Sequence, residues 1–421
     1  METLHIGSPK LTQDGKSTVL SAQVRNGSTE TELWFRVPTC VNPTLSSDPF
    51  FATSLIPAMA LGKTLEIDGT ISPSLLSSSE SVQDIFHNWF PELARIPVTA
   101  APLSKSRETS GGVGCFFSGG IDSLYTFLKH EQEITTLIYV HGFDVSLNDT
   151  PLREQVSDAL HSFSQKTGKK IIEIETNLRE FTNQHGDWGK HTHGAALASI
   201  GLLLNNLLKR IYIPSTNSFI ELFPWGSHPL TDPLWSTETT QFIHDGCEAS
   251  RFEKVSTIAT DDRALSTLRV CWENRKGEYN CGSCEKCLRT MTALEILGAL
   301  NRCPTFSIPL NIDTIRQFEL TTHIGQLHWN CNYESAIKYQ RTDIATALKA
   351  AIDQYNVAKV INSLSDQFAD VVTNPRWQEF TLRHREHLFL SLLKGNRRWL
   401  TREIILENAK LILGWHHKKG D

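Results

Sequence analysis

The sequence predicts an α/β protein with a doubly wound parallel sheet, a β-rich N-terminal domain and a helical C-terminal region. Three observations lead to this prediction. Between residues 113 and 300, short apolar runs alternate with segments of helical periodicity, which is typical of a parallel sheet with helices on both faces. The patterning before this stretch is mainly that of strands, and the patterning after it is mainly that of helices. We therefore expect three parts: residues 1–105, 106–302 and 303–421.

Composition narrows the class of protein. The chain has 421 residues, of which 40% are hydrophobic and 21% charged, as in ordinary globular proteins. Its formal net charge is −5, whereas a protein that holds a large RNA through its phosphates is usually basic, so nucleic acid is not an expected partner. We see no apolar run long enough to span a membrane, and METLHIGSPK has no apolar signal core. The nine cysteines are odd in number and unevenly placed, which argues against a secreted disulfide scaffold. We expect a cytoplasmic protein that binds no membrane.

The N-terminal part has the pattern of a small β-rich domain. Residues 17–24 and 31–37 have strand composition and are joined by an Asn-Gly turn. Residues 65–69 add a short strand, and residues 82–93 have helical spacing. We expect an accessory domain here, and a docking surface for a partner is the alternative.

The central part begins with an apolar run at 113–117, which is bounded by glycine and indicates a buried strand. The sequence SGGIDS follows, and then Leu124, Phe127 and Leu128 recur at helical spacing. Further strands are expected at 136–140, 170–175 and 210–214, and further helices at 152–166 and 194–208, the last of them apolar enough to be buried.

The SGGIDS turn predicts an anion site, because backbone N–H groups and a helix N-terminus converge at such a turn. Gly119 and Gly120 let the backbone approach a phosphate closely, and Ser118 and Ser123 add hydroxyl donors. Asp122 suits a Mg²⁺ ion that bridges phosphate oxygens. An ordinary turn with a serine cap is the alternative.

Two later segments follow the expected carboxyl ends of strands, where doubly wound folds bind nucleotides. The first is HGFD, which places His141 and Asp144 at that edge for cofactor binding. The second is a long loop, residues 215–236, and long loops in compact domains are often functional. Its indole rings can stack on a heterocycle, and its carboxylate can accept N–H bonds from a guanine-like base. Alternatively, the tryptophans pin the loop to the core. The expected substrate-binding residues are Trp225, His228, Asp232 and Trp235.

Arg251 and Lys254 lie on one face if their segment is helical, and two cations there would neutralise departing pyrophosphate. A solvated helix face is the alternative. Cys247 lies close by in sequence and is a candidate nucleophile. His191 and His193 have the spacing of a metal pair, but no third ligand is evident, so we favour a non-metal role.

Four cysteines form the second strong motif, with the spacing C-x₉-C-x₂-C-x₂-C. Such spacing lets four thiolates surround one Zn²⁺, and a site closed in this way is structural. An iron–sulfur cluster is the alternative. The expected ligands are Cys271, Cys281, Cys284 and Cys287.

SGGIDS resembles the pyrophosphate-binding loop of the N-type ATP pyrophosphatases. Together with the four cysteines it resembles, over residues 113–300, the 7-cyano-7-deazaguanine synthase (QueC-like) family. The resemblance implies an adenine nucleotide alpha hydrolase-like fold, ATP as cosubstrate and zinc on the four cysteines. The residues before 106 and after 302 are extra, and the substrate loop does not match. By this resemblance the ATP-binding residues are Ser118, Gly119, Gly120, Ile121, Asp122 and Ser123.

We therefore expect an enzyme that adenylates a carboxylate on a 7-deazaguanine-type base and releases pyrophosphate. Ammonia or an amine then displaces AMP to give an amide or a nitrile. The alternatives are conjugation of the activated base to the amine of a partner protein in an antiphage system, a tRNA thiolation-type enzyme, and a non-catalytic nucleotide-binding scaffold. A homodimer is left open. The expected catalytic residues are Asp122, Ser123, Arg251 and Lys254.

The C-terminal part shows helical periodicity at 343–353, 357–368, 384–393 and 401–413. Its end is locally basic. A solvated helical face explains this basic end better than a contact with nucleic acid.

Overall fold

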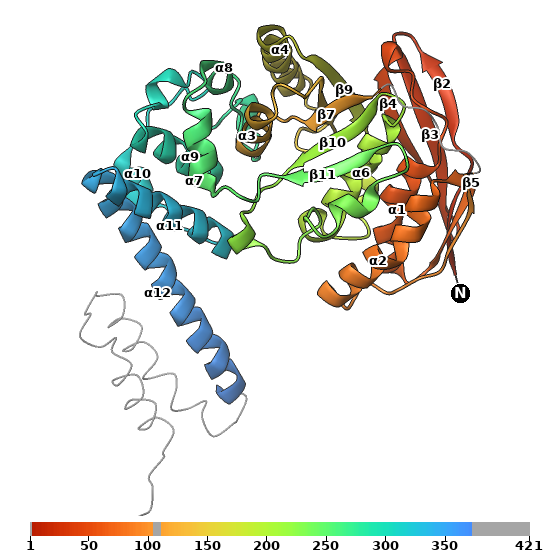
Figure 1. Ribbon diagram of the computed structural model, residues 1–421. Helices are drawn as coiled ribbons and strands as arrows, with labels where there is room; N and C mark the ends of the chain where they lie inside the picture. The colour runs from red at the N-terminus through yellow and green to blue at the C-terminus, as the bar shows by residue number, and fades with distance from the viewer. Residues whose placement is uncertain (1, 104–110, 373–421) are drawn as a thin grey trace, which may run out of the picture. The chain divides into compact units, whose positions relative to one another are not determined.

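The computed structural model describes residues 2–103 and 111–372 (Figure 1). The chain forms two compact units, Met1–Ile352 and Asp353–Asp421, and the described residues of the second unit are the later part of one helix. All the sites discussed below lie in the first unit.

Five parallel strands form the centre of the sheet: β7 (Gly112–Phe116), β8 (Thr136–His141), β9 (Lys170–Thr176), β10 (Leu208–Pro214) and β11 (Gln241–Asp245). Their spatial order is β11-β10-β7-β8-β9. The order reverses between β7 and β10, as in Rossmann-like sheets, and ligands bind in such folds at the carboxyl end of that switch point. The α/β class predicted from the sequence is confirmed at this level, and the sheet as a whole is mixed.

The N-terminal strands extend this sheet and do not form one of their own. β4 (Thr29–Pro38) pairs with β9 in antiparallel fashion, and its Arg36 lies opposite Glu175 with an ion pair of 3.0 Å. β3 (Ser17–Asn26), β1 (Thr3–Ile6), β5 (Thr64–Ile71) and β6 (Val98–Pro102) continue outward, and β2 (Lys10–Asp14) pairs with β3. The sheet therefore has 11 strands. β4 covers the edge of β9, which would otherwise be left without a pairing partner.

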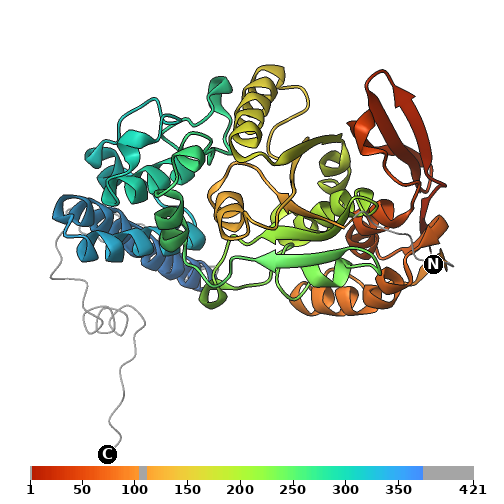
Figure 2. The same ribbon diagram turned by 45° about the horizontal axis from the view of Figure 1, so that its top comes forward.

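Helices cover both faces of the central strands (Figures 1 and 2). α3 (Ile121–Lys129) packs on β7 and β10, and α4 (Thr150–Thr167) packs on β9. α6 (His193–Leu203) shares the main hydrophobic core with α1 (Asp48–Leu61). These two helices are apolar around their whole circumference and are buried accordingly, joined by a 2.8 Å hydrogen bond between Thr53 and Ser199.

The remaining elements follow in chain order. The helices are α2 (Pro73–Trp89), α5 (Leu178–Thr182), α7 (Arg251–Ile258), α8 (Asp262–Leu265), α9 (Glu285–Ile296), α10 (Ile312–Gln317), α11 (His323–Lys338) and α12 (Thr342–Val372). The short turns are η1 (Thr39–Val41), η2 (Trp188–Thr192), η3 (Phe219–Glu221), η4 (Asp232–Trp235), η5 (Arg275–Gly277) and η6 (Leu300–Arg302).

Several sequence expectations are corrected here. The helix predicted at 194–208 ends at Leu203, and Leu208 already belongs to β10. Strand β11 and helices α1 and α11 were not expected. The two helices predicted at 343–353 and 357–368 are one continuous helix, α12. The expected boundaries near 105 and 302 are not edges of a compact unit, because Met1–Ile352 is continuous. The predicted helices at 384–393 and 401–413, and the basic end, lie outside the described residues.

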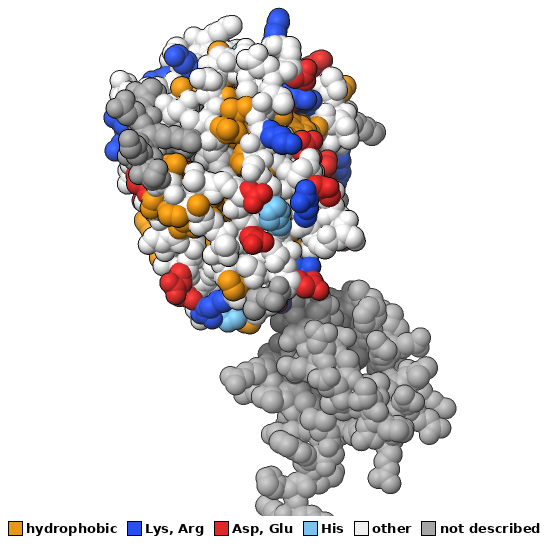
Figure 3. All heavy atoms as spheres, turned by 90° about the vertical axis from the view of Figure 1, so that its right-hand side faces the viewer, with side chains coloured by type: hydrophobic (Ala, Val, Ile, Leu, Met, Phe, Trp, Pro, Cys, Tyr) orange, Lys and Arg blue, Asp and Glu red, His pale blue; other side chains and the backbone are white. Residues whose placement is uncertain are grey.

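The face carried by the N-terminal strands has acidic and basic side chains interspersed with apolar ones (Figure 3). A surface of mixed sign gives no strong electrostatic field for a charged partner. Across the described residues, the helices are all too short or too polar to cross a membrane.

Candidate functional site

The SGGIDS turn lies at the carboxyl end of β7 and leads directly into α3, with Gly120 as the N-cap. Gly119 has φ +72°, and a Cβ there would lie 3.1 Å from the carbonyl oxygen of Thr267, so glycine is required. The turn is closed by weak contacts: Ser118 Oγ lies 3.4 Å from Ser123 Oγ and accepts from Gly120 N at 3.3 Å. Because these contacts are long, the two serine hydroxyls and the Gly120 N–H could bond a phosphate instead with little loss of hydrogen-bond energy. The structure thus places residues 118–123 at the switch point of the sheet.

Asp122 faces two buried cations from α7. Arg251 Nη1 lies 3.0 Å from Asp122 Oδ1, and Lys254 Nζ lies 3.3 Å from the same oxygen. Burial acts to raise the pKa of Asp122, but Arg251 and Lys254 outweigh it and hold the pKa below its usual value. α7 begins with a capping box between Ser250 and Glu253, which fixes the start of the helix and therefore the two cations. A solvated helix face is wrong for this segment, because Lys254 is fully buried.

Two further cations come from α9. Lys286 and Arg289 lie three residues apart, and the charge of each acts on both Asp122 and Arg251. Neither residue is among the candidate site residues predicted from the sequence. We call the following four residues the cationic cluster: Arg251, Lys254, Lys286 and Arg289.

His328 of α11 faces the cationic cluster. The residue is 2% exposed, and within the described part of the chain neither ring nitrogen has a hydrogen-bond partner. Burial and the charges of the cationic cluster lower its pKa, so the ring is neutral. α11 packs against α9 and α7 and is held there by bonds such as Trp329 Nε1 to Glu285 Oε1 at 3.1 Å (Figures 1 and 2). An unpaired buried imidazole is costly, so we expect a water molecule or a ligand to bond it here.

A narrow pocket opens beside the loop at the carboxyl ends of β10 and β11. Trp225 and His228 line it, as the sequence predicts for substrate-binding residues, together with His193, Ser215 and His244. Trp225 packs edge-on against Phe223 at 5.4 Å. The pocket combines an indole, imidazoles and a hydroxyl, but its free volume of about 10 Å³ holds no more than a water molecule, so it would have to widen to admit a heterocycle.

Two of the predicted substrate-binding residues do not face a ligand. Trp235 is 1% exposed and packs edge-on against Phe51 in the core, so the expectation that it stacks on a base is wrong. Asp232 is fully buried and already engaged, since it accepts from Ser227 Oγ at 2.7 Å and bonds His244 Nδ1 at 2.7 Å. It is therefore not the free acceptor that the sequence predicts, and it orients His244 instead.

The two residues predicted to bind the cofactor at the end of β8, His141 and Asp144, differ in how exposed they are. His141 is 3% exposed and bonds Glu173 at 2.7 Å, so its ring serves the fold and is not open to a nucleotide. Asp144 is exposed, and its charge acts on Lys286 and His193. It therefore lies near Lys286 on the exposed side of the cationic cluster.

His191 and His193 belong to no metal-binding group among the described residues, where the cysteines form the one such group.

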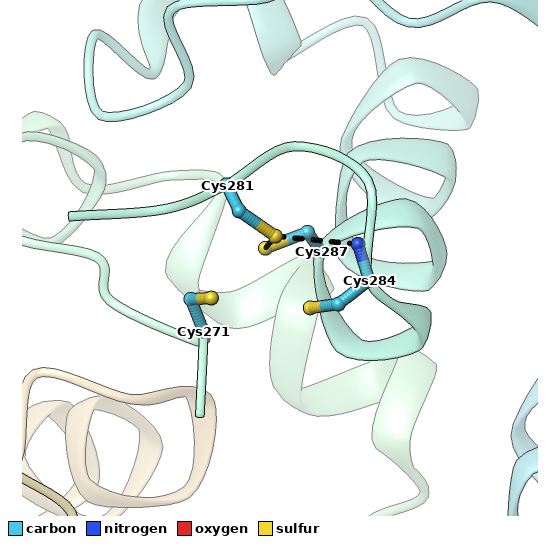
Figure 4. A group of neighbouring side chains, drawn as sticks. All are labelled: Cys271, Cys281, Cys284 and Cys287. Atoms are coloured by element: carbon cyan, nitrogen blue, oxygen red, sulfur yellow. Dashed lines mark hydrogen bonds between the residues drawn. The ribbon is translucent and has the colours of Figure 1, made fainter. Parts of the chain in front are cut away.

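The four predicted cysteines converge (Figure 4). They are all buried, and their sulfurs lie within 4.8 Å of one another. Sulfurs around a tetrahedral zinc are ~3.8 Å apart if Zn–S is ~2.3 Å, and Cys281 Sγ lies 3.9 Å from Cys287 Sγ. Cys284 N donates to Cys281 Sγ at 3.3 Å, and Gly282, with φ +66°, makes the turn between them. The cluster can hold a metal ion such as zinc, and it sits at the start of α9.

Comparison of the chain with protein-family models, with curated proteins and with solved structures finds no significant match. The sequence reasoning missed His328 and His244, because neither belongs to a local motif. The packing of α11 brings His328 to the cationic cluster. The pairing of β11 with β10 brings His244 to the pocket beside residues 215–236.

Proposed function

We propose that this protein is an ATP-dependent, AMP- and pyrophosphate-forming enzyme of the QueC-like type. It adenylates a carboxylate on a 7-deazaguanine-type base, and ammonia or an amine then displaces AMP. The observation that carries the proposal is the phosphate-type turn at the switch point of the sheet, facing a cationic cluster of which Arg251, Lys254 and Arg289 are buried. Such a turn with four nearby cations suits a polyphosphate better than a neutral ligand.

The residues would act as follows. The backbone of residues 118–123 and the hydroxyl of Ser123 would hold the β- and γ-phosphates, and Arg251 and Lys254 would stabilise pyrophosphate as it leaves. Both cations are fixed by α7 before the substrate arrives, so little reorganisation is needed in the transition state. The pocket beside the loop, once widened, would hold the base between Trp225 and His228.

Asp122 is the residue that would hold Mg²⁺ bound to the phosphates, where the ion would neutralise charge. Its carboxylate is shared by Arg251 and Lys254 in the free protein, so it would have to exchange a cation for the metal. The zinc proposed at the four cysteines would be structural, because the four sulfurs leave no open position.

The proposal is tested by measuring AMP and pyrophosphate release from ATP, with carboxy-deazaguanine and ammonium each present or absent. Products are identified by mass spectrometry. We expect pyrophosphate release that depends on the acid, and an amide or nitrile when ammonium is added. ATP binding without AMP formation would instead support the scaffold alternative.

Asp122→Asn is the decisive variant for this assay, because it keeps the shape of the side chain and removes its charge. We expect turnover to fall by about 100-fold or more, as when a metal contact worth several kcal/mol is lost. The matched control is Asp84→Asn, an exposed carboxylate on α2 that pairs with Arg95 away from the loop. Equal activity of the two variants would contradict the assignment.

A further inference from the structure

A cysteine, a histidine and an aspartate are arranged in series beside the nucleotide loop. His244 lies in β11, and Cys247 follows the end of that strand. Asp232 Oδ2 lies 2.7 Å from His244 Nδ1, which leaves Nε2 as the ring nitrogen available to the thiol. His244 and Cys247 are close enough for each side chain to act on the other, and Cys247 Sγ donates to Ser215 Oγ at 3.2 Å. This is the order of groups that activates a cysteine nucleophile.

The series is connected to the site proposed for ATP. Lys254 Nζ donates to the carbonyl oxygen of Ser215 at 2.6 Å and to Asp122 at 3.3 Å. The same lysine is close enough for its charge to act on Cys247. Ser215 and His244, the two partners of the thiol, both line the pocket that contains Trp225. An acyl group that enters this pocket would meet these two partners of Cys247, whose own side chain is buried.

The charges around the thiol favour its ionised form. Burial acts to raise the pKa of Cys247, but its interactions with His244 and Ser215 and the charges of His244 and Lys254 outweigh it, so the pKa lies below its usual value. Burial likewise acts to lower the pKa of His244, and the bond to Asp232 overcomes it and raises the pKa to about 9. A cysteine that only fills space in a core needs no such pair of partners.

We propose that Cys247 is a catalytic nucleophile that takes the acyl group from the adenylate before the amine does. This inference rests on the proposed adenylation. The Cys247 thiolate attacks the acyl carbon, a C–S bond forms, and the C–O bond to phosphate breaks so that AMP leaves with its electron pair. The amine then attacks the thioester, a C–N bond forms, and the C–S bond breaks so that the sulfur leaves as the thiolate beside His244, while the proton lost by the amine goes to solvent.

The test is intact-protein mass spectrometry of the full chain with ATP, Mg²⁺ and carboxy-deazaguanine, without ammonium and after acid quench. We expect a mass increase equal to the acid minus water, mapped to the peptide of Cys247 and removed by hydroxylamine. Pyrophosphate is measured in the same sample. Pyrophosphate release without an adduct on Cys247 would overturn the thioester and leave adenylation standing, whereas the absence of pyrophosphate would overturn both.

Cys247→Ala and His244→Gln separate the two chemical steps. We expect Cys247→Ala to keep acid-dependent pyrophosphate release and to lose amide formation by about 100-fold or more. His244→Gln should slow adduct formation by about 10²- to 10⁴-fold, because the thiol loses its base. The control is Cys40→Ser, which changes an exposed cysteine in η1 and should keep the adduct. Unchanged amide formation by Cys247→Ala would also overturn the proposal.

Discussion

His244 shows how one hydrogen bond sets the charge of a buried side chain. Desolvation alone would keep an imidazole neutral in this position. The carboxylate of Asp232 lies 2.7 Å away and is itself fully buried, so its charge favours the protonated imidazole. Asp232 therefore acts through His244, and not through a ligand.

The raised pKa of His244 predicts a pH dependence of stability. Its folded-state pKa is about 9 and its ordinary value is 6.5. A raised pKa stabilises the folded state below the unfolded value, and that contribution is lost as pH rises through 9. Between about pH 6 and about pH 10, the wild type should lose about 3 kcal/mol more unfolding free energy than His244→Gln. Urea unfolding at both pH values measures this, and equal losses would contradict it.

Replacing His328 should affect ATP binding and thermal stability in opposite directions. Its buried, unpaired ring costs free energy in the free protein, so His328→Leu should unfold at the same or a higher temperature. The same change removes a polar partner for phosphate oxygens and should weaken ATP binding by about 10- to 100-fold. Calorimetry gives both quantities. The matched control is His323→Leu, an exposed position on the same helix. A lower melting temperature with unchanged ATP affinity would indicate a merely structural role.

At the scale of elements, α9 connects the cysteine cluster to the SGGIDS turn. Cys284 is its N-cap and Cys287 lies in its first turn, while Lys286 and Arg289 of the same two turns act on Asp122. A metal at the cysteines would thus fix the start of the helix, and with it two cations of the site.

This connection predicts that loss of metal weakens ATP binding as well as the fold. A structural zinc can contribute on the order of 10 kcal/mol. Cys284→Ser should therefore lose bound metal, melt at a clearly lower temperature and bind ATP more weakly, whereas Cys331→Ser, outside the cluster, should do none of these. Elemental analysis gives the metal content, and visible absorbance distinguishes iron–sulfur from zinc. Full metal content in Cys284→Ser would contradict the assignment.

At the scale of the whole molecule, the N-terminal strands and helices share one core with the central parallel strands. β4 completes the edge of β9, and α1 packs on α6. Phe51 of α1 contacts Trp235, which belongs to the loop between β10 and β11. The N-terminal residues therefore pack against the elements that carry the candidate site, on the side of α6 and Trp235.

A shared core predicts that the unit Met1–Ile352 unfolds cooperatively. Phe51→Ala removes a fully buried ring and should cost about 3–5 kcal/mol. Far-UV circular dichroism and tryptophan fluorescence should report the same single transition in the wild type and in the variant. Leu11→Ala, at an exposed position of β2, should change little. An early, separate transition of the N-terminal part would contradict a single unit.

The sequence by itself determined the features that depend on local pattern. The strand, turn and helix around residues 112–129, the parallel strands β8, β9 and β10, and the four cysteines were all predictable, because glycine turns, apolar runs and ligand spacing are encoded in short stretches. The common face of Arg251 and Lys254 followed from helical spacing alone.

Only the tertiary structure decided which distant residues meet. The pairing of β4 with β9 made one sheet of two expected domains, since an edge strand carries no local sign of its partner. Trp235 was assigned to a ligand and lies in the core, while His328 and His244 were brought to the loop by the packing of α11 and the pairing of β11. Burial and charge at a site are sums over neighbours far apart in the chain, so they exist only once the chain has folded.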